Sequence, residues 1–200
     1  MRRVVDLILA VPAVIILGPA MLALAAAIRA ESAGPAIFRQ VRIGLDGAPF
    51  TILKFRTMRS EVAAATIRMG GREDPRITRL GGLLRRTRLD ELPQLVNVIR
   101  GEMTMVGPRA EVPQFVELYT PEQRVVLSVP PGITGPGQLE YARRFEPLLD
   151  GAADPNQVYL ERILGPKLEI DLEYVRQRSF AGDIRILVRT AMLVLGRDRG

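Results

Sequence analysis

Residues 85–109, RRTRLDELPQLVNVIRGEMTMVGPR, are the stretch around which the chain is organised. Two adjacent carboxylates, Asp90 and Glu91, lie there between a group of arginines and a Gly-Pro-Arg turn that ends at Arg109. Asp-Glu-Leu-Pro is typical of a helix start, because Asp caps the first turn, Glu favours the positive end of the dipole and Pro is tolerated there. A well-capped helix is therefore the simplest interpretation of the pair.

The neighbouring arginines favour a second interpretation. Arg85, Arg86 and Arg88 come directly before the two carboxylates. Carboxylates among fixed cations stay ionised, and the same cations can bind phosphate. An anionic nucleophile, a metal-binding carboxylate and arginines for a diphosphate are the groups that phosphoryl transfer requires. We therefore predict that Asp90 and Glu91 belong to such a site.

Composition excludes several other kinds of chemistry. The chain has 200 residues, 48% of them hydrophobic, which indicates one domain with a packed core. It has no Cys and no His, so disulfides, thiolate catalysis, Ser-His triads and His-ligated zinc are excluded. The net charge of +6 suits nucleic acid, anionic lipid or phosphorylated substrates. The lack of Trp and the small number of Phe and Tyr disfavour a binder of single-stranded nucleic acid.

An apolar run over residues 4–28 is long enough for a membrane helix, which needs ~20 apolar residues. Arg2 and Arg3 precede it, and Arg29 follows. A secretory signal peptide is one alternative, but the run is long for a signal and no clear polar cleavage region follows. A simple spanning helix is a second alternative.

A Gly18-Pro19 pair, together with Pro12, favours a third alternative, a re-entrant hairpin. Proline removes a hydrogen bond and clashes with the preceding turn, so we expect a kink. Basic residues at both ends indicate that both ends are cytoplasmic. A helix that enters the membrane, breaks at Gly18-Pro19 and returns satisfies both observations.

Two alternating segments over residues 35–58 are joined by Leu-Asp-Gly-Ala and predict a β-hairpin, since Asp-Gly between such segments is a strong turn signal. Lys54 and Arg56 share one face of the second strand. That face is either solvated or turned toward an anionic ligand, and the spacing does not separate the two interpretations.

The loop over residues 130–138, PPGITGPGQ, is too rich in Gly and Pro for a regular element. Such a loop is either structural or exposes backbone amides to a phosphate or nucleotide, and we include Gln138 among the candidate substrate-binding residues. The remaining elements that the sequence predicts are a helix or loop over 59–72, an Arg-rich helix after Thr78, a helix ended by Gly101, helical structure over 111–128 with a capping box at 120–123, an amphipathic helix over 155–178 broken at Gly165-Pro166, and a largely apolar segment over 183–195.

With these features in view, nearly the whole chain resembles the bacterial sugar transferases, the monotopic polyprenyl-phosphate phosphoglycosyltransferases that start lipid-linked glycan assembly. Each motif is weak alone, but their order makes the resemblance specific. The motifs are Arg3-Val4-Val5-Asp6, Gly18-Pro19, Arg42-Ile43-Gly44, Lys54-Phe55-Arg56-Thr57-Met58, Asp74-Pro75-Arg76-Ile77-Thr78, Leu89-Asp90-Glu91-Leu92-Pro93-Gln94-Leu95, Gly107-Pro108-Arg109, Pro131-Gly132-Ile133-Thr134-Gly135 and Asp171-Leu172-Glu173-Tyr174.

The resemblance implies a mechanism for these residues. A UDP-sugar binds with Mg²⁺, Asp90 attacks the phosphorus that carries the sugar, UMP leaves, and polyprenyl phosphate then takes the phosphosugar from the aspartate. Glu91 helps to hold the metal, since Mg²⁺ prefers one or two carboxylates beside a diphosphate. The substrate phosphates are expected to lie against Lys54, Arg56, Arg85 and Arg109.

The resemblance also implies a mostly helical α+β fold with a small β-hairpin or sheet and interfacial amphipathic helices. Residues 1–30 would form the re-entrant membrane hairpin, and residues 31–200 the catalytic domain at the cytoplasmic face of the bacterial inner membrane. The expected partners are the UDP-sugar, polyprenyl phosphate and membrane lipid, without nucleic acid, and the sequence leaves open whether the chain forms a homodimer. Gly18 stands where many relatives have Ser, and Pro136-Gly137 replaces the usual aromatic residue after Ile-Thr-Gly.

Two rival functions remain open from the sequence. One is a non-catalytic, basic, membrane-anchored module that binds anionic lipid or nucleic acid, which explains the charge and the anchor but not the ordered motifs. The other is a lipid phosphate hydrolase or related phosphotransferase that uses the same aspartate and releases phosphate without sugar transfer.

Overall fold

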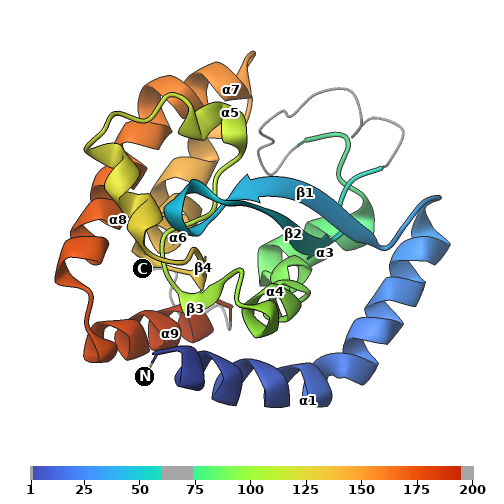
Figure 1. Cartoon of the computed structure of the whole chain (residues 1–200). Helices are drawn as coiled ribbons and strands as arrows, with labels where there is room; N and C mark the ends of the chain where they lie inside the picture. The colour runs from blue at the N-terminus through green and yellow to red at the C-terminus, as the bar shows by residue number, and fades with distance from the viewer. Residues whose placement is uncertain (1, 60–73, 195–200) are drawn as a thin grey trace.

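A computed structural model of the chain describes residues 2–59 and 74–194 (Figure 1). The expectation for residues 59–72 falls outside this range except for its first residue, as does Leu195 of the last predicted segment. The described helices and strands are, in chain order, α1 Arg2–Glu31, β1 Ile37–Ile43, η1 Leu45–Gly47, β2 Pro49–Phe55, α3 Arg79–Thr87, η2 Leu89–Glu91, α4 Gln94–Arg100, β3 Thr104–Val106, α5 Pro113–Val116, η3 Gln123–Ser128, β4 Gly132–Thr134, α6 Pro136–Glu140, η4 Tyr141–Phe145, η5 Glu146–Leu149, α7 Pro155–Val158, η6 Tyr159–Leu164, α8 Gly165–Gln177 and α9 Phe180–Val194.

The apolar N-terminal run forms one helix, α1, with Pro12 and Pro19 inside it. Figure 1 shows that this helix is bent rather than straight. The expected break at Gly18-Pro19 is therefore not an interruption of the helix, because a proline removes one hydrogen bond and bends a helix whose neighbouring turns still hold. Helix α1 is long and apolar enough to cross a membrane. Only 6% of its most apolar 18-residue segment is buried within the protein.

The start of α1 is held to the rest of the chain by polar contacts. Arg3 donates to the carbonyl of Ile99 at 2.7 Å and so satisfies the C-terminal end of α4. The buried carboxylate of Asp6 accepts hydrogen bonds from the Thr104 hydroxyl and the Met105 amide, each at 2.9 Å. These contacts fix α1 against α4 and β3.

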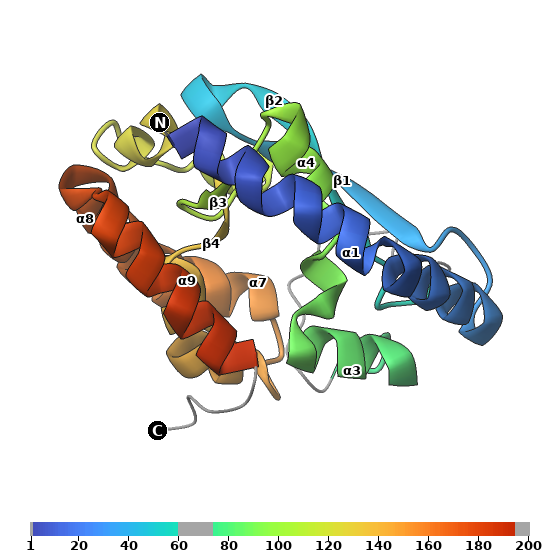
Figure 2. The same cartoon turned by 90° about the horizontal axis from the view of Figure 1, so that it is seen from below.

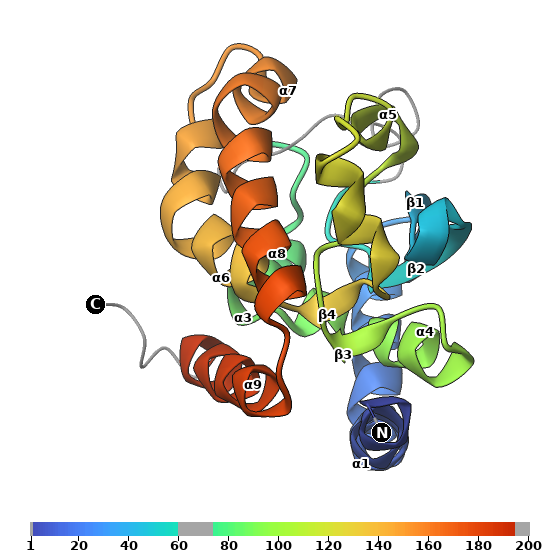
Figure 3. The same ribbon diagram turned by 60° about the vertical axis from the view of Figure 1, so that its left-hand side comes forward.

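A second connection joins α1 to the last described helix. Arg2 forms an ion pair with Asp183 of α9 at 3.0 Å, and the hydroxyl of Tyr174 on α8 donates to the same carboxylate at 2.7 Å. Helices α1 and α9 consequently lie along one side of the molecule (Figures 2 and 3). Many large apolar side chains of these two helices are exposed, among them Ile15, Ile16, Leu22, Ile184 and Val188.

The predicted β-hairpin is confirmed, with β1 and β2 antiparallel and Ile37 opposite Phe55. Its turn contains Asp46 and Gly47, whose φ angles are 53° and 79°. This left-handed region is tolerated by Asp and favoured by Gly, which explains the Asp-Gly signal.

A parallel pair of short strands, β3 and β4, was not predicted. It pairs Thr104 with Gly132 and Val106 with Thr134, and so brings the Gly-Pro-Arg turn beside the Gly- and Pro-rich loop. A side chain at Gly132 would overlap the backbone of Gly107, so the pairing depends on the absence of a Cβ there. Part of the predicted loop is thus regular structure.

The C-terminal half packs around its own core. Phe115 and Tyr159 stack at its centre with ring centroids 5.0 Å apart. The capping box at 120–123 is confirmed, because the Thr120 amide donates to Gln123 Oε1 and the Gln123 amide to Thr120 Oγ1. The helical structure predicted over 111–128 consists only of the short segments α5 and η3, whereas α7, η6 and α8 run on without a gap through Gly165-Pro166.

Candidate active site

The two adjacent carboxylates lie in a tight turn between two helices. Helix α3 ends at Thr87 and is followed by Arg88, which has a φ of 59°, and the 3-10 turn η2 carries Asp90 and Glu91. Helix α4 begins only at Gln94, and among the described residues no side chain caps it. The interpretation of Asp90 as a helix cap is therefore wrong, since Pro93 sets the start of the helix and leaves both carboxylates available for other contacts.

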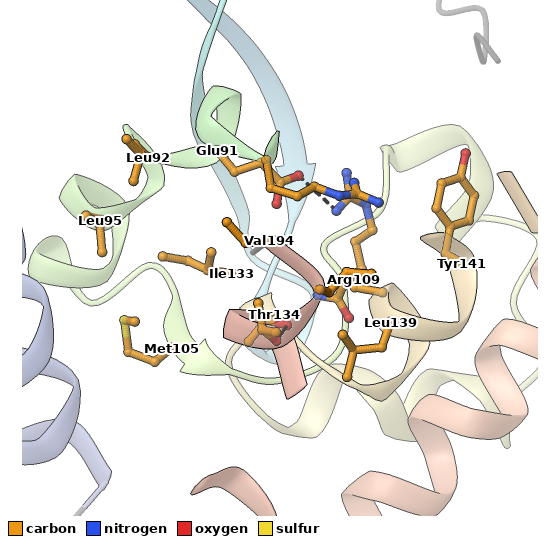
Figure 4. A pocket seen from close by; sticks show the side chains of 14 residues that line it. Glu91, Leu92, Leu95, Met105, Arg109, Ile133, Thr134, Leu139, Tyr141 and Val194 are labelled. Carbon is orange, nitrogen blue, oxygen red and sulfur yellow. Dashed lines mark hydrogen bonds and ion pairs between the residues drawn. The ribbon is translucent and has the colours of Figure 1, made fainter. Parts of the chain in front are cut away.

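Two cations from distant elements bind Glu91. Lys54 of β2 contacts Glu91 Oε1 at 2.8 Å, and Arg109 contacts the same oxygen at 3.2 Å. Figure 4 shows the ion pair between Arg109 and Glu91. Asp90 and Glu91 are both buried, with exposed fractions of 9% and 8%. The structure thus brings together three of the residues that the sequence singled out.

Burial and charge move the pKa values of the two carboxyl groups apart. Burial alone would raise the pKa of Glu91, but the charges of Lys54 and Arg109 outweigh it and bring the pKa well below its usual range. Burial raises the pKa of Asp90, and the nearby Lys54 opposes this only in part. Glu91 is therefore fixed as an anion, while Asp90 is the more basic of the two.

The two cations respond to the same surroundings. Burial lowers the pKa of Lys54, although Glu91 opposes the shift. Burial also disfavours the charged form of Arg109, but the charge of Glu91 outweighs it and raises the pKa of the guanidinium. A permanent positive charge thus lies beside Glu91 at every physiological pH.

A cavity of about 200 Å³ lies against this cluster (Figure 4). Glu91 and Arg109 line it, whereas Asp90 is not one of the lining residues. Arg85 does not line it either, although its charge slightly opposes the rise that burial causes in the pKa of Asp90. The lining residues are Arg88, Glu91, Leu92, Leu95, Met105, Arg109, Ile133, Thr134, Gln138, Leu139, Tyr141, Thr190, Leu193 and Val194.

Gln138 lines the cavity, as expected for a substrate-binding residue, but its amide nitrogen is already engaged. It donates to the carbonyls of Gly132 at 3.2 Å and Gly107 at 3.4 Å, and so ties β4 to the Gly-Pro-Arg turn. Its buried Oε1 atom has no hydrogen-bond partner among the described residues. That oxygen is the part of Gln138 left to accept a hydrogen bond from a ligand.

Arg56 was expected beside Lys54 in the phosphate pocket, and the structure places it elsewhere. Its guanidinium donates to the carbonyls of Ser32 at 2.6 Å, Ile28 at 3.3 Å and Ala33, at the C-terminal end of α1. Carbonyls at and just after a helix C-terminus carry the negative end of the helix dipole and attract a cation. Arg56 therefore joins α1 to β2 and does not line the cavity.

A buried polar network behind Arg109 was missed by the sequence reasoning. Glu111 accepts hydrogen bonds from Lys167 and Tyr159, and all three side chains are almost fully buried. Asp171, 1% exposed, accepts from the Gly137 amide at 3.2 Å, and burial raises its pKa to about 6. Only the Asp171 motif of the family resemblance signalled part of this network, which anchors the backbone on either side of Arg109.

The carboxylates fit a magnesium ion only in company with a substrate. No group of three His, Cys, Asp or Glu side chains suited to a metal occurs within residues 2–59 and 74–194. Asp90 and Glu91 nevertheless supply adjacent oxygen ligands, and Mg²⁺ commonly takes one or two carboxylates together with substrate phosphates. The donor set is therefore compatible with a Mg²⁺ ion carried on a diphosphate.

Comparison with known proteins shows which protein family the chain resembles. The sequence model of the family described as "Bacterial sugar transferase" matches residues 1–197. A UDP-glucose:undecaprenyl-phosphate glucose-1-phosphate transferase of Caulobacter vibrioides is 37% identical over 98% of the chain and 70% of its own length. The protein of the same name from Escherichia coli is 36% identical over 95% of the chain.

The relatives differ greatly in length. The chain covers only 39% of the Escherichia coli relative. By contrast, the exopolysaccharide production protein PSS of Rhizobium leguminosarum bv. phaseoli is 34% identical over 100% of the chain and 98% of its own length. The similarity thus extends to a relative of similar size as well as to part of longer proteins.

Proposed function

The chain belongs to the bacterial sugar transferase family, and on this premise we propose that it moves a sugar 1-phosphate from a UDP-sugar to a polyprenyl phosphate. The observation that carries the proposal is the contact of Glu91 with both Lys54 and Arg109, directly beside Asp90. An ionised carboxylate held by two cations next to a more basic carboxylate supplies charge stabilisation and a nucleophile in one place.

The reaction would proceed in two displacements at one phosphorus atom. A carboxylate oxygen of Asp90 attacks the phosphorus that bears the sugar, and the bond from that phosphorus to the bridging diphosphate oxygen breaks. UMP leaves with the bonding electron pair. A phosphate oxygen of polyprenyl phosphate then attacks the same phosphorus, the bond to Asp90 breaks, and the carboxylate is regenerated with polyprenyl diphosphosugar as product.

The cations and carboxylates of the chain have separate roles in this scheme. Arg109 and Arg88 line the cavity and would orient the phosphates, while Lys54 holds Glu91 in place. Glu91 would hold Mg²⁺, which supplies neutralisation of phosphate charge when bound, and Asp90 is left as the nucleophile.

The donor and the acceptor are suggested by the relatives. Several bear names that specify UDP-glucose and undecaprenyl phosphate, including those of Caulobacter vibrioides and Escherichia coli. We therefore propose UDP-glucose as the first donor to test and undecaprenyl phosphate as the acceptor. The name of the Rhizobium relative suggests exopolysaccharide production as the downstream use.

The attachment of α1 supports a re-entrant membrane helix at the cytoplasmic face of the inner membrane. Arg2 contacts Asp183 near its start, and Arg56 binds the carbonyl of Ser32 just after its end. A straight span would separate its ends by ~30 Å of hydrocarbon. Polar contacts from both ends to one packed body favour a helix that enters and leaves the bilayer on the same side, with its exposed apolar side chains in lipid.

The experiment that tests the proposal is an intact-mass measurement. Detergent-purified protein is incubated with Mg²⁺ and UDP-glucose, without acceptor lipid, and other UDP-sugars follow in parallel. We expect a mass gain of one phosphosugar in the wild type, its absence in Asp90→Asn, and its loss when EDTA removes the divalent metal. The matched variant Asp150→Asn changes a carboxylate outside the cavity and should form the adduct normally.

Addition of polyprenyl phosphate to the protein that carries the phosphosugar should then remove the adduct and give polyprenyl diphosphosugar. Full turnover by Asp90→Asn would contradict the covalent mechanism. Absence of both adduct and UMP release with every donor, even with acceptor present, would favour the non-catalytic membrane module. Release of inorganic phosphate without sugar transfer would favour the phosphate hydrolase.

A further inference from the structure

The cavity beside Glu91 has two chemically different ends. Arg109 and Tyr141 lie toward one side in Figure 4, while Leu92, Leu95 and Met105 lie toward the other. The charged end includes the ion pair of Arg109 with Glu91. One cavity therefore offers a phosphate-binding end and an apolar end.

The apolar end has few polar groups to offer a ligand. The hydroxyls of Thr134 and Thr190 are hydrogen-bonded to each other at 2.7 Å, and Thr190 also donates to the Ile186 carbonyl. A sugar or a nucleobase carries several donors and acceptors, and leaving them unpaired on burial is costly. This end is therefore unsuited to the polar parts of a nucleotide sugar and suited to hydrocarbon.

Helix α9 contributes both to the lining of the cavity and to the exposed apolar side of the molecule. Its residues Thr190 and Leu193 line the cavity, whereas Ile184 and Val188 on the same helix are about half exposed, at 48% and 52%. Helix α9 lies with α1 on one side of the molecule (Figures 2 and 3). The same helix thus presents apolar side chains both to the cavity and to the surroundings.

We propose that the wall formed by Met105, Ile133 and Leu193 binds the prenyl chain of the lipid acceptor next to its phosphate, and so sets the preference for a prenyl acceptor. The phosphate of this acceptor lies at the Arg109 end, and the first isoprene units lie along the wall. The proposal rests on the proposed function and deepens it, because it separates the acceptor's part of the cavity from the donor's.

The test compares two wall variants with a control on the same helix. Met105→Gln and Leu193→Gln make the wall polar with side chains of similar length, and Ile184→Gln makes the same kind of change on the exposed side of α9. The acceptor is a two-isoprene prenyl phosphate in detergent, so that partition into a bilayer does not enter the result. The KM for this acceptor and the KM for the UDP-sugar are measured from UMP release, and adduct formation is measured by intact mass without acceptor.

We expect each wall variant to raise the acceptor KM about tenfold, because a buried hydrocarbon contact is replaced by a polar group. Adduct formation and the KM for the UDP-sugar should stay within about twofold of the wild type, and Ile184→Gln should leave all three values unchanged. Far-UV circular dichroism and Tm establish that each variant is folded. If Leu193→Gln does not fold, Met105→Gln still tests the proposal.

Three results would overturn the inference. These are an unchanged acceptor KM in both wall variants, an equal rise in the donor KM, or an equal effect of Ile184→Gln. Failure of the proposed function gives a different result, since the wild type itself would then release no UMP with any UDP-sugar.

Discussion

Asp90 and Glu91 are neighbours in the chain, yet their surroundings give them opposite character. Lys54 and Arg109 both contact Glu91 Oε1 and hold it ionised. Asp90 has a raised pKa because burial penalises its charge. Divergent pKa values in a pair of carboxyl groups are typical of acid–base or nucleophilic sites, because each group then has a different task.

Lys54→Met should shift the pH dependence of activity. In the proposed mechanism Asp90 attacks as an ionised carboxylate, so activity should be lost as the pH falls through its pKa. The charge of Lys54 lowers the pKa of Asp90, and its removal therefore moves the acid limb of the kcat/KM profile to higher pH. We also expect kcat/KM at neutral pH to fall by at least about tenfold, since Glu91 loses one of its two cations. Steady-state UMP release across pH measures both effects.

Lys54→Arg is the matched control, because it keeps the charge and should keep the acid limb close to its wild-type position. A Lys54→Met profile that falls in height without moving along the pH axis would contradict the electrostatic role of Lys54.

The sequence predicts which candidate residues lie together where their positions depend on neighbours in the chain. Asp90, Glu91 and Arg109 belong to one short stretch, and Lys54 lies on a strand whose register follows from the Asp-Gly turn. Arg56 makes contacts that the sequence did not predict, because its partners are backbone carbonyls at the end of α1 and just after it. No residue type or spacing marks such a carbonyl as the partner of a given arginine.

At the scale of elements, the hairpin, α3, the end of α4 at Gly101 and α9 follow from local signals. Gly101 has a φ of 87°, as its position after the last apolar residues predicted. The β3–β4 pair does not, since it joins segments 28 residues apart whose glycines and prolines read locally as loop. The contacts of Asn97 do not follow from local signals either. Its side chain binds the backbone of β2 at Leu53 and Thr51.

Arg56→Ala tests the element-scale role of this residue. We expect the free energy of unfolding to fall by about 2–3 kcal/mol, because the carbonyls after α1 lose a charged donor. The Tm in detergent should fall accordingly, while the KM for the UDP-sugar below the Tm stays within about twofold of the wild type. Arg39→Ala, an exposed arginine on the paired strand, is the control and should change the Tm little. Loss of donor affinity at an unchanged Tm would instead return Arg56 to the phosphate pocket.

At the scale of the whole molecule, the exposed apolar side chains of α1 and α9 lie on one side, as the proposed membrane attachment requires. The sequence predicted an apolar N-terminal segment with a break at Gly18-Pro19, and α1 is that segment as one bent helix without a break. It did not predict that α1 is held by Arg56 at one end and by Asp183 at the other, because these contacts join residues far apart in the chain.

Cysteine labelling tests the proposed re-entrant arrangement, and the chain has no Cys of its own to interfere. Single cysteines are introduced ahead of the first residue, at Ala30 after the bend of α1, and at Glu117 as an exposed reference on the body. We expect a membrane-impermeant maleimide to label none of them in intact spheroplasts and all of them after lysis. Labelling of the first site alone in intact spheroplasts would show that α1 crosses the membrane.

The ion pair of Arg2 with Asp183 has a consequence for the order in which the chain assembles. Its partners are separated by 181 residues, so Arg2 leaves the ribosome long before Asp183 exists. At typical rates of synthesis the interval is roughly 10–40 s. During that time α1 lacks its tether to α9, although its partners at Arg56, Ile99 and Thr104 are made earlier, and the α9 contact is among the last long-range contacts to form. A nascent chain stalled before Asp183 would therefore carry α1 without its tether to α9, an intermediate that crosslinking on stalled ribosomes can capture.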